Sequence, residues 1–399
     1  MQYDLVFEGG GAKGMVFVGA MQAFEAEGHT PGRLLGTSAG AITAALLAAG
    51  YTSAEMLAAL AERENERSVF AGFMGVPEPV DKAALKTSAT RQLLRQINLP
   101  FVPDRFEEKL DDWLTEWLGA QPGLRHVFSF IERGGWYSAD NFLAWLRRRL
   151  DTGTFKGAQR ALSRLTFAQY HAATGADLTL IASDVTGGAM LVLNHQTAPE
   201  LPVVWAVRMS MSIPLLWQEV IWQPEWGAYR GRPLAGHAIV DGGLLSNFPL
   251  ELLVSDDPQV TAVMGPKTSS EALGLLIDES QPVPGDEAGA APTGAAAGLG
   301  ELQTVRRLNQ ILNTALSARD KLVIEAFEKY VVRLPAKGYG TTEFDMTEAR
   351  RERLVAAGRA VMTDYLAQRA AEPVSFGPDP EAARTQQAAD KLARKLLGD

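Results

Sequence analysis

The feature that most constrains the fold is a pair of strand–turn–helix units in the first fifty residues. Residues 3–8, YDLVFE, form a β-prone run that stops at three consecutive glycines, and apolar residues then recur at helical spacing as far as Phe24. Residues 33–36, RLLG, followed by 38–50, SAGAITAALLAAG, repeat the pattern. Two such units in succession predict a parallel sheet with helices on both faces.

The later sequence supplies more elements of the same kind. Residues 52–150 are mainly helical in pattern, and a further helix is expected over 202–212, PVVWAVRMSMS. We expect additional strands in four apolar runs, at residues 176–185, 189–194, 237–240 and 260–265. Together these elements predict an α/β fold of three layers, α/β/α, around a central and mostly parallel sheet.

The domain organisation follows from one break in composition. Residues 278–299 are rich in Gly, Ala and Pro without periodicity, so we expect a flexible insert there. A long helix is expected over 301–330, and residues 371–399 form a polar tail with a short helix. We therefore predict a single catalytic domain made of residues 1–277 and 300–370.

Composition narrows the classes of function. The 399 residues carry 38 basic and 47 acidic side chains, a net charge of −9, which argues against a nucleic-acid partner. The absence of cysteine excludes disulfides, thiolate metal sites and a cysteine nucleophile. The amino terminus lacks the basic start of a secretory signal, and the apolar stretch 39–50 is too short to span a bilayer. We expect a cytoplasmic protein.

The first motif that carries chemistry is the glycine loop of the first unit. As G-x-G-x-x-G it satisfies the dinucleotide-binding fingerprint, but the second strand ends in Gly36-Thr37-Ser38 where that fingerprint needs an acidic residue. A phosphate-binding Walker loop would need Ser or Thr after the lysine. The alternatives are an anion-binding nest of backbone amides, to which the lysine adds positive charge, or a simple tight turn. The loop residues are Gly9, Gly10, Gly11, Ala12, Lys13 and Gly14.

The second motif is G-x-S-x-G around Ser38. Gly36 and Gly40 lie two positions on either side of the serine, where small residues keep a strand and a helix from clashing in a strained nucleophile turn. A helix N-cap role for Ser38 is compatible with the same position.

The third motif is Asp241-Gly242-Gly243, which ends the apolar run HAIV. An aspartate at the end of a buried strand lies at the sheet edge where α/β proteins gather their sites, and the glycines allow close approach of a substrate or of backbone. The same residues are also a common turn signal.

In order and type the three motifs resemble those of the patatin-like phospholipases. The stretches LTLIASDVTGG, AVRMSMSIP and TEARRERLVAAGRAVM add to the resemblance, which covers roughly residues 3–270 and 300–368. Lys13 stands where an arginine is often found in that family, which keeps the charge but loses the planar fork.

The resemblance implies a patatin-like fold and a serine lipid acyl hydrolase that uses no cofactor and no metal. Ser38 would be the nucleophile, Asp241 its base, and the loop from Gly9 to Gly14 the oxyanion hole. A phospholipid or other acyl-ester lipid would be the substrate, with transient contact to a membrane surface. An exposed aspartate is a poor base near neutral pH, so we expect partly apolar surroundings that raise its proton affinity.

Two other functions remain open at this point. An α/β-hydrolase would use Ser38, Asp184 and His237 as a triad, although such folds place several strands before the nucleophile and only one precedes Ser38 here. A non-catalytic nucleotide-binding module would use the glycine loop for phosphate, but leaves Ser38 and Asp241 without a role.

Two aromatic sets allow a membrane-facing or a core interpretation. We favour core packing or a lid for the first set, because the polar face of its helix is acidic. The first set is Phe106, Leu110, Trp113, Leu114 and Trp117, and the second is Trp217, Trp222, Trp226 and Tyr229. The remaining histidines are expected to be structural, since no histidine and carboxylate grouping has metal-ligand spacing.

Overall fold

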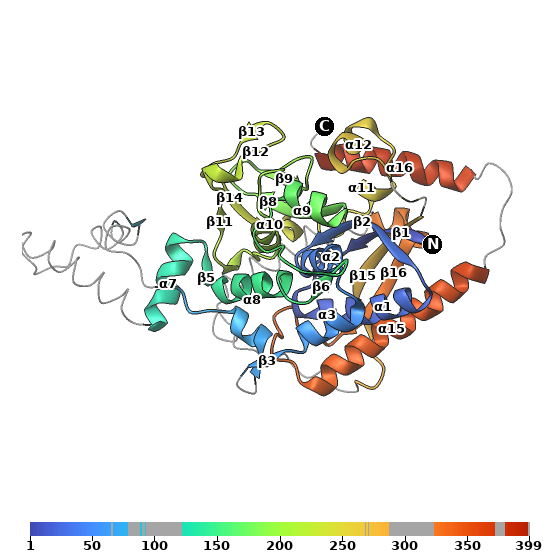
Figure 1. Ribbon diagram of the computed structural model, residues 1–399, viewed down its shortest axis with the longest axis horizontal. Coiled ribbons are helices and arrows are strands. Elements are labelled where there is room, and N and C mark those ends of the chain that lie inside the picture. The colour runs from blue at the N-terminus through green and yellow to red at the C-terminus, as the bar shows by residue number, and fades with distance from the viewer. Residues whose placement is uncertain are drawn as a thin grey trace, which may run out of the picture.

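The computed structural model describes residues 1–64, 67–78, 88–89, 92, 122–267, 269, 271–286, 323–371 and 380–397. A central sheet with the strand order β11-β14-β8-β2-β1-β15-β16 runs through it, and β9 pairs with β8 (Figure 1). The strands are β1 (Gln2–Phe7), β2 (Thr30–Thr37), β8 (Leu178–Asp184), β9 (Ala189–Leu193), β11 (Val220–Ile221), β14 (Ala238–Asp241), β15 (Glu271–Pro282) and β16 (Val331–Lys337).

The sheet is mostly parallel. The pairs β1–β2, β1–β15, β2–β8 and β15–β16 are parallel, whereas β9, β14 and β11 pair antiparallel. The helices are α1 (Met15–Ala26), α2 (Ala39–Ala48), α3 (Ser53–Leu60), α7 (Pro122–Glu132), α8 (Asp140–Leu150), α9 (Phe167–Thr174), α10 (Val203–Ser210), α11 (Glu251–Val254), α12 (Pro258–Met264), α15 (Glu348–Ala371) and α16 (Pro380–Leu397). Short strands pair outside the sheet: β3 (Arg63–Glu64) with β4 (Arg67–Ser68), β5 (Gly135–Tyr137) with β10 (Leu215–Trp217), β6 (Thr154–Phe155) with β7 (Ala158–Gln159), and β12 (Ala228–Tyr229) with β13 (Arg232–Pro233).

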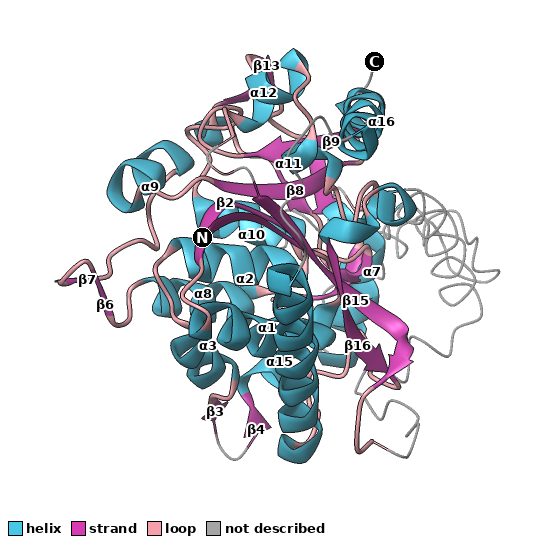
Figure 2. Ribbon diagram, turned by 90° about the vertical axis from the view of Figure 1, so that its right-hand side faces the viewer, coloured by secondary structure: helices cyan, strands magenta, loops and turns pink. Residues whose placement is uncertain are grey.

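Two hydrophobic cores cover the two faces of the sheet, because side chains alternate along each strand. On β1, Leu5 and Phe7 pack into the larger core with α1, α2, α8, α10 and α15. Val6 points the other way, into the smaller core with α11, α12 and α16. The sheet separates these two helical layers (Figure 2), so the expected three-layer α/β/α fold is confirmed.

Glycines allow α15 to lie directly against α1. A Cβ atom on Gly19 would lie 1.8 Å from the carbonyl oxygen of Val355, and one on Gly358 would lie 2.2 Å from that of Val16. The late helix α15 therefore completes the layer that begins with α1.

One expected strand is a helix. Residues 260–265 were expected to extend the sheet, but α12 occupies Pro258–Met264. The Asp257 side chain accepts a hydrogen bond from the Gln259 amide at 2.9 Å, and proline opens the first turn. Short apolar runs do not distinguish a strand from a buried helix. The outer parallel strands are instead β15 and β16.

The insert begins later than expected, and the tail is packed. Residues 278–282 belong to β15, since the strand continues to pair with β16 as far as Pro282 and Lys337. The rest of the insert lies outside the described residues from 287 onward, as does the expected helix over 301–330 up to residue 322. In the polar tail, α16 buries Ala389, Ala393 and Leu396 in the smaller core.

Candidate active site

Ser38 occupies a strained turn between β2 and α2. Its φ of 53° and ψ of −118° lie in a region that side chains rarely adopt. A Cβ atom on Gly36 would lie 2.3 Å from the Gly40 carbonyl oxygen, and one on Gly40 would lie 2.1 Å from that of Phe7. Only glycine fits at these two positions, which is the steric reason for the G-x-S-x-G spacing.

Ser38 and Asp241 meet because β2 and β14 end against neighbouring residues of β8. Thr37, the last residue of β2, pairs with Ile181, and Asp241, the last residue of β14, pairs with Ala182. Since β9 occupies the other edge of β8 over the same residues, the two strand ends face each other along one edge. The fold thereby brings together side chains that are about two hundred residues apart in the sequence.

Asp241 lies in a buried environment. Its side chain is 4% exposed, and Oδ1 accepts a hydrogen bond from the Gly243 amide at 2.7 Å. Burial raises the pKa of Asp241 to about 7, although interactions with Ser38 and with the Gly243 amide lower it in part. Among the described residues, no donor within hydrogen-bond distance pairs with the buried Oδ2. The carboxylate therefore keeps one oxygen available for a proton.

The carboxyl end of α10 supports both residues. The Ser38 amide donates to Oγ of Ser210 at 3.0 Å, and the Asp241 amide donates to the Ser212 carbonyl at 2.9 Å. Arg208, 4% exposed, contacts the Ser212 hydroxyl and donates to the Gln218 carbonyl at 2.7 Å. Burial lowers the pKa of Arg208 to about 10. The AVRMSMSIP stretch was noted in the sequence, but its serines were not assigned to the site.

The glycine loop borders Ser38 and leaves two amides without an acceptor. A Cβ atom on Gly9 would lie 3.0 Å from Cβ of Ser38. Three amides of the loop are engaged, those of Gly9 with the Asn247 carbonyl, Ala12 with the Thr341 carbonyl and Lys13 with the Gly10 carbonyl. Among the described residues, no acceptor pairs with the amides of Gly10 and Gly11. Of the six residues in the expected oxyanion hole, these two have donors free for an anion.

Lys13 differs from expectation. Its side chain is 4% exposed, and Nζ forms an ion pair with the Glu279 carboxylate on β15. Glu279 therefore offsets part of the positive charge that we expected Lys13 to add to the loop.

Asn247 links the glycine loop to the Asp241 turn and was missed in the sequence. Its Nδ2 donates to the Gly9 carbonyl at 3.0 Å and to Oε1 of Glu8 at 3.1 Å. A Cβ atom on Gly9 or Gly243 would lie 2.2 or 2.9 Å from its Oδ1. The only local signal was an asparagine six residues after Asp241, in DGGLLSN.

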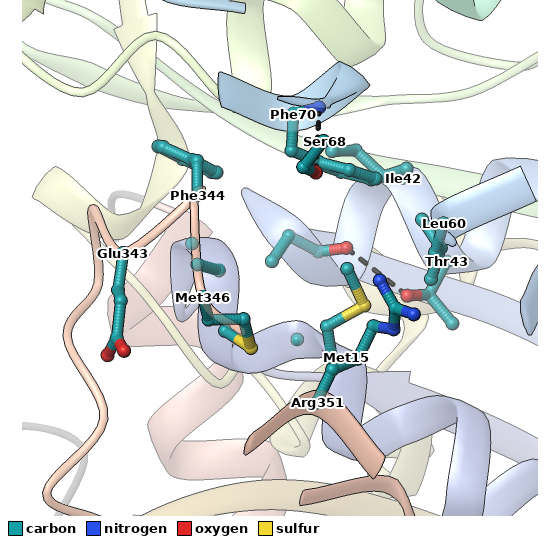
Figure 3. A pocket seen from close by; sticks show the side chains of 14 residues that line it. Met15, Ile42, Thr43, Leu60, Ser68, Phe70, Glu343, Phe344, Met346 and Arg351 are labelled. Carbon is teal, nitrogen blue, oxygen red and sulfur yellow. Dashed lines mark hydrogen bonds between the residues drawn. The ribbon is translucent and has the colours of Figure 1, made fainter. Parts of the chain in front are cut away.

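A small, mainly apolar pocket of about 40 Å³ lies beside the loop (Figure 3). Ala39, which follows Ser38, lines it together with Gly11 and Ala12. Its charged lining residues are Glu343 and Arg351, both of which come from the last third of the chain. Most of the other side chains in its wall are apolar: Met15, Ile42, Leu60, Phe70, Phe344 and Met346.

His237 is paired, but away from Ser38. Its Nδ1 lies 2.9 Å from Oδ2 of the buried Asp184. Four residues of strand separate His237 from Asp241, about 13 Å at the usual rise of a strand. The structure therefore brings Asp184 and His237 together without Ser38.

The two aromatic sets have different outcomes. Trp217, Trp222, Trp226 and Tyr229 are all buried, at 1, 0, 5 and 7% exposure, so they belong to the core and do not face a membrane. The set from Phe106 to Trp117 lies outside the described residues. No helix in the described ranges is both long and apolar enough to cross a lipid bilayer.

Comparison with known proteins places the chain in a family. A family model for patatin-like phospholipase matches residues 5–254. Uncharacterized protein YqhO of Bacillus subtilis (strain 168) is 27% identical over 368 residues, which cover 90% of this chain and 96% of that protein. Probable lipid hydrolase 463L of Invertebrate iridescent virus 6 is 20% identical over 250 residues, which cover 63% of this chain and 62% of that protein.

Two solved structures are also similar. VipD from Legionella pneumophila aligns with a TM-score of 0.44 and 18% identity, over 92% of this chain and 67% of that chain. The type III effector protein ExoU aligns with a TM-score of 0.37 and 19% identity, over 93% and 54% respectively. Since the family model spans more than half of the sequence, the chain belongs to the patatin-like phospholipase family.

Proposed function

We propose that this protein hydrolyses fatty-acyl esters of glycerophospholipids with Ser38 as nucleophile and Asp241 as base. Membership of the family makes it a lipid hydrolase. The observation that carries the finer proposal is the position of Ser38 in a strained turn beside a buried aspartate whose pKa is raised to about 7. A carboxylate with that pKa is a far better base at neutral pH than an exposed aspartate.

The chemistry runs through an acyl-enzyme. Asp241 takes the Ser38 proton as the serine oxygen attacks the ester carbonyl, and the negative charge that develops on the carbonyl oxygen is held by the amides of Gly10 and Gly11. The intermediate collapses by releasing the alcohol, which takes up the proton. Water, deprotonated by Asp241, then attacks the acyl-Ser38 ester, and the fatty acid is released as the Ser38 oxygen takes the proton back from Asp241. No histidine, metal or cofactor takes part.

The small apolar pocket beside the loop marks the direction in which we propose that the acyl chain lies. It begins at Ala39, adjacent to the nucleophile, and its wall is mainly apolar. Burial of each methylene of a chain contributes about 0.8 kcal/mol. A lipid in a membrane can reach this pocket only if the enzyme docks on the surface, so we propose a cytoplasmic enzyme that contacts membranes transiently.

The alternative functions have less support. A triad would need His237 beside Ser38, whereas their separation along the sheet is several times a hydrogen bond. A nucleotide-binding module would leave the strained turn at Ser38 and the buried Asp241 without a role.

The test is lipid profiling of mixed phospholipid vesicles incubated with purified protein. We expect free fatty acid and lysophospholipid from the wild type and neither from Ser38→Ala. The matched control His237→Gln should retain activity, because Gln can still bond Asp184. A folded Ser38→Ala protein that still hydrolyses phospholipid would contradict the assignment of Ser38 as nucleophile. A wild-type protein that cleaves soluble esters but no phospholipid would contradict the proposed substrate class.

A further inference from the structure

Three side chains far apart in the sequence converge at the amino-terminal end of β8. His171 lies on α9, Asp177 directly precedes β8, and His195 follows β9. An imidazole nitrogen from each histidine and a carboxylate oxygen from Asp177 all lie within 4.8 Å of one another. Sequence spacing gave no histidine and carboxylate grouping suited to a metal, whereas the fold brings these three side chains together.

The backbone holds His171 and Asp177 in place. α9 starts with a capping box between Thr166 and Gln169 and ends at Gly175, whose φ of 73° terminates the helix. The Asp177 carbonyl accepts a hydrogen bond from the Leu34 amide of β2 at 2.8 Å. Both positions are therefore set by regular structure.

His195 is held by a side-chain turn. Oδ1 of Asn194 accepts from the amides of Gln196 and Thr197 at 2.9 and 3.0 Å, and Nδ2 of Asn194 donates to the Val263 carbonyl at 2.8 Å. This turn anchors His195 to the hairpin of β8 and β9 and to α12. The three positions come from separate parts of the fold, and each is fixed independently.

The distances suit a small cation with mixed nitrogen and oxygen ligands. Nδ1 of His171 and Nδ1 of His195 lie 3.5 and 3.9 Å from Oδ1 of Asp177. Around Zn²⁺, with bonds of 2.0 to 2.2 Å, tetrahedral ligand atoms are about 3.4 Å apart, so the two separations from Asp177 are already close to those of a zinc site.

The rings would also have to turn. They are stacked with centroids 3.9 Å apart and planes at 7°, and a bound ion must lie close to both ring planes. Nδ1 of His171 would exchange its 3.1 Å contact with the Ala176 carbonyl for the ion. The side chains of the three residues are 24 to 38% exposed, which leaves room for this movement and for a water ligand.

We propose that His171, Asp177 and His195 bind a divalent transition ion, with Zn²⁺ as the ion that their ligand chemistry suits best. The ion ties α9 to the β8–β9 hairpin. Asp177 precedes Ala182 by five residues, about 16 Å along the strand, so the ion is structural and lies outside the hydrolytic chemistry.

The experiment uses the full chain, stripped with a chelator and then titrated with ZnCl₂ by isothermal calorimetry. We expect one equivalent of Zn²⁺ to bind and the thermal unfolding midpoint to rise, because an ion that binds only the folded state stabilises it. Added Co²⁺ should give visible absorption bands of a nitrogen and oxygen site.

Variants locate the ion. His195→Ala and Asp177→Asn should lose Zn²⁺ binding and the rise in midpoint. His126→Ala is the matched control, since His126 is another half-buried histidine, bonded to the Trp136 carbonyl at 2.9 Å. The proposal is overturned if folded wild type shows no saturable Zn²⁺ binding, or if the wild-type titration persists in both His171→Ala and His195→Ala. The wild-type titration tests the proposal by itself, even where a variant fails to fold.

Discussion

In the proposed mechanism Asp241 must be ionised to accept the Ser38 proton, and burial raises its pKa to about 7. Protonation below about pH 7 removes the base. We therefore expect kcat/KM for a soluble short-chain ester to rise with pH, with a midpoint at about 7, and to level off above it. A pH profile measures this midpoint, and a midpoint near the ordinary aspartate value of 3.8 would contradict the assigned environment.

Asp241→Asn removes the proposed base and leaves its surroundings almost unchanged. The amide is nearly isosteric and its oxygen can still accept from Gly243, but it cannot take a proton. Hydrolysis should fall by about two to four orders of magnitude, the usual size of a general-base contribution. Steady-state kinetics beside the control His237→Gln checks this, and a folded Asp241→Asn enzyme with wild-type turnover would refute the dyad.

The same substitution should stabilise the fold at high pH. Because the pKa of Asp241 is raised in the folded state, its contribution to stability is present at low pH and is lost as the pH rises through about 7. Asparagine does not ionise, so Asp241→Asn should raise the free energy of unfolding at pH 8 by about 1–4 kcal/mol and change it little near pH 4. Urea unfolding at the two pH values distinguishes this from a uniform gain.

Short sequence motifs predicted the residues whose identity is set by contacts with their neighbours in the sequence. Gly36 and Gly40 are recognisable because the turn at Ser38 excludes any Cβ atom, and that steric demand acts over a few residues. Ser210 and Asn247 act through contacts with segments far away in the sequence, and no short pattern encodes such contacts. The roles of Ser38 and Asp241 remain predictions.

At the scale of elements, the close packing of α2 against β1 explains why the turn at Ser38 needs glycine at position 40, and a substitution there tests this. Gly40→Ala should destabilise the chain by about 1–3 kcal/mol and reduce activity, since the new Cβ would collide with the Phe7 carbonyl and displace Ser38. Gly72→Ala is the control, because no atom lies within 4 Å of its added Cβ. Thermal melts and ester kinetics compare the stability and activity of the two variants. Equal effects would mean that the contact with the Phe7 carbonyl is relieved without loss of stability.

Elements with a clear sequence pattern were predictable. Elements that depend on pairing with distant segments of the chain were not. The strands β1 and β2 follow glycine-punctuated apolar runs, whereas the run that became α12 is too short for periodicity to decide. β15 and β16 were not anticipated. β15 joins the sheet beside β1 from a distant part of the chain, and β16 in turn pairs with β15.

At the scale of the molecule, α16 acts as a cover for one face. Asp390 on α16 accepts from the Ser255 hydroxyl at 2.7 Å and from the Asp256 amide at 2.9 Å, in addition to the apolar contacts. Truncation after residue 379 should lower the unfolding midpoint and increase binding of an apolar dye, since the smaller core loses Ala389, Ala393 and Leu396. An unchanged midpoint would show that α16 contributes no stability.

At the scale of the molecule, metal removal should affect thermal stability but not the rate of ester hydrolysis. If the histidine site holds Zn²⁺, a chelator should lower the unfolding midpoint and leave ester hydrolysis unchanged, because backbone amides hold the oxyanion. Parallel melts and rate measurements with and without EDTA provide the comparison. Loss of hydrolysis in the chelator, restored by a divalent ion, would contradict the dyad mechanism.

Under the proposed mechanism, the meeting of β2 and β14 on one edge of β8 also determines which lengths of chain can hold a complete catalytic pair. During synthesis the ribosome delivers the nucleophile early, and every chain that ends before Asp241 lacks the base. A truncated product of translation or of degradation that stops short of β14 should therefore be inactive towards lipids. Activity is expected only of chains that extend past Asp241.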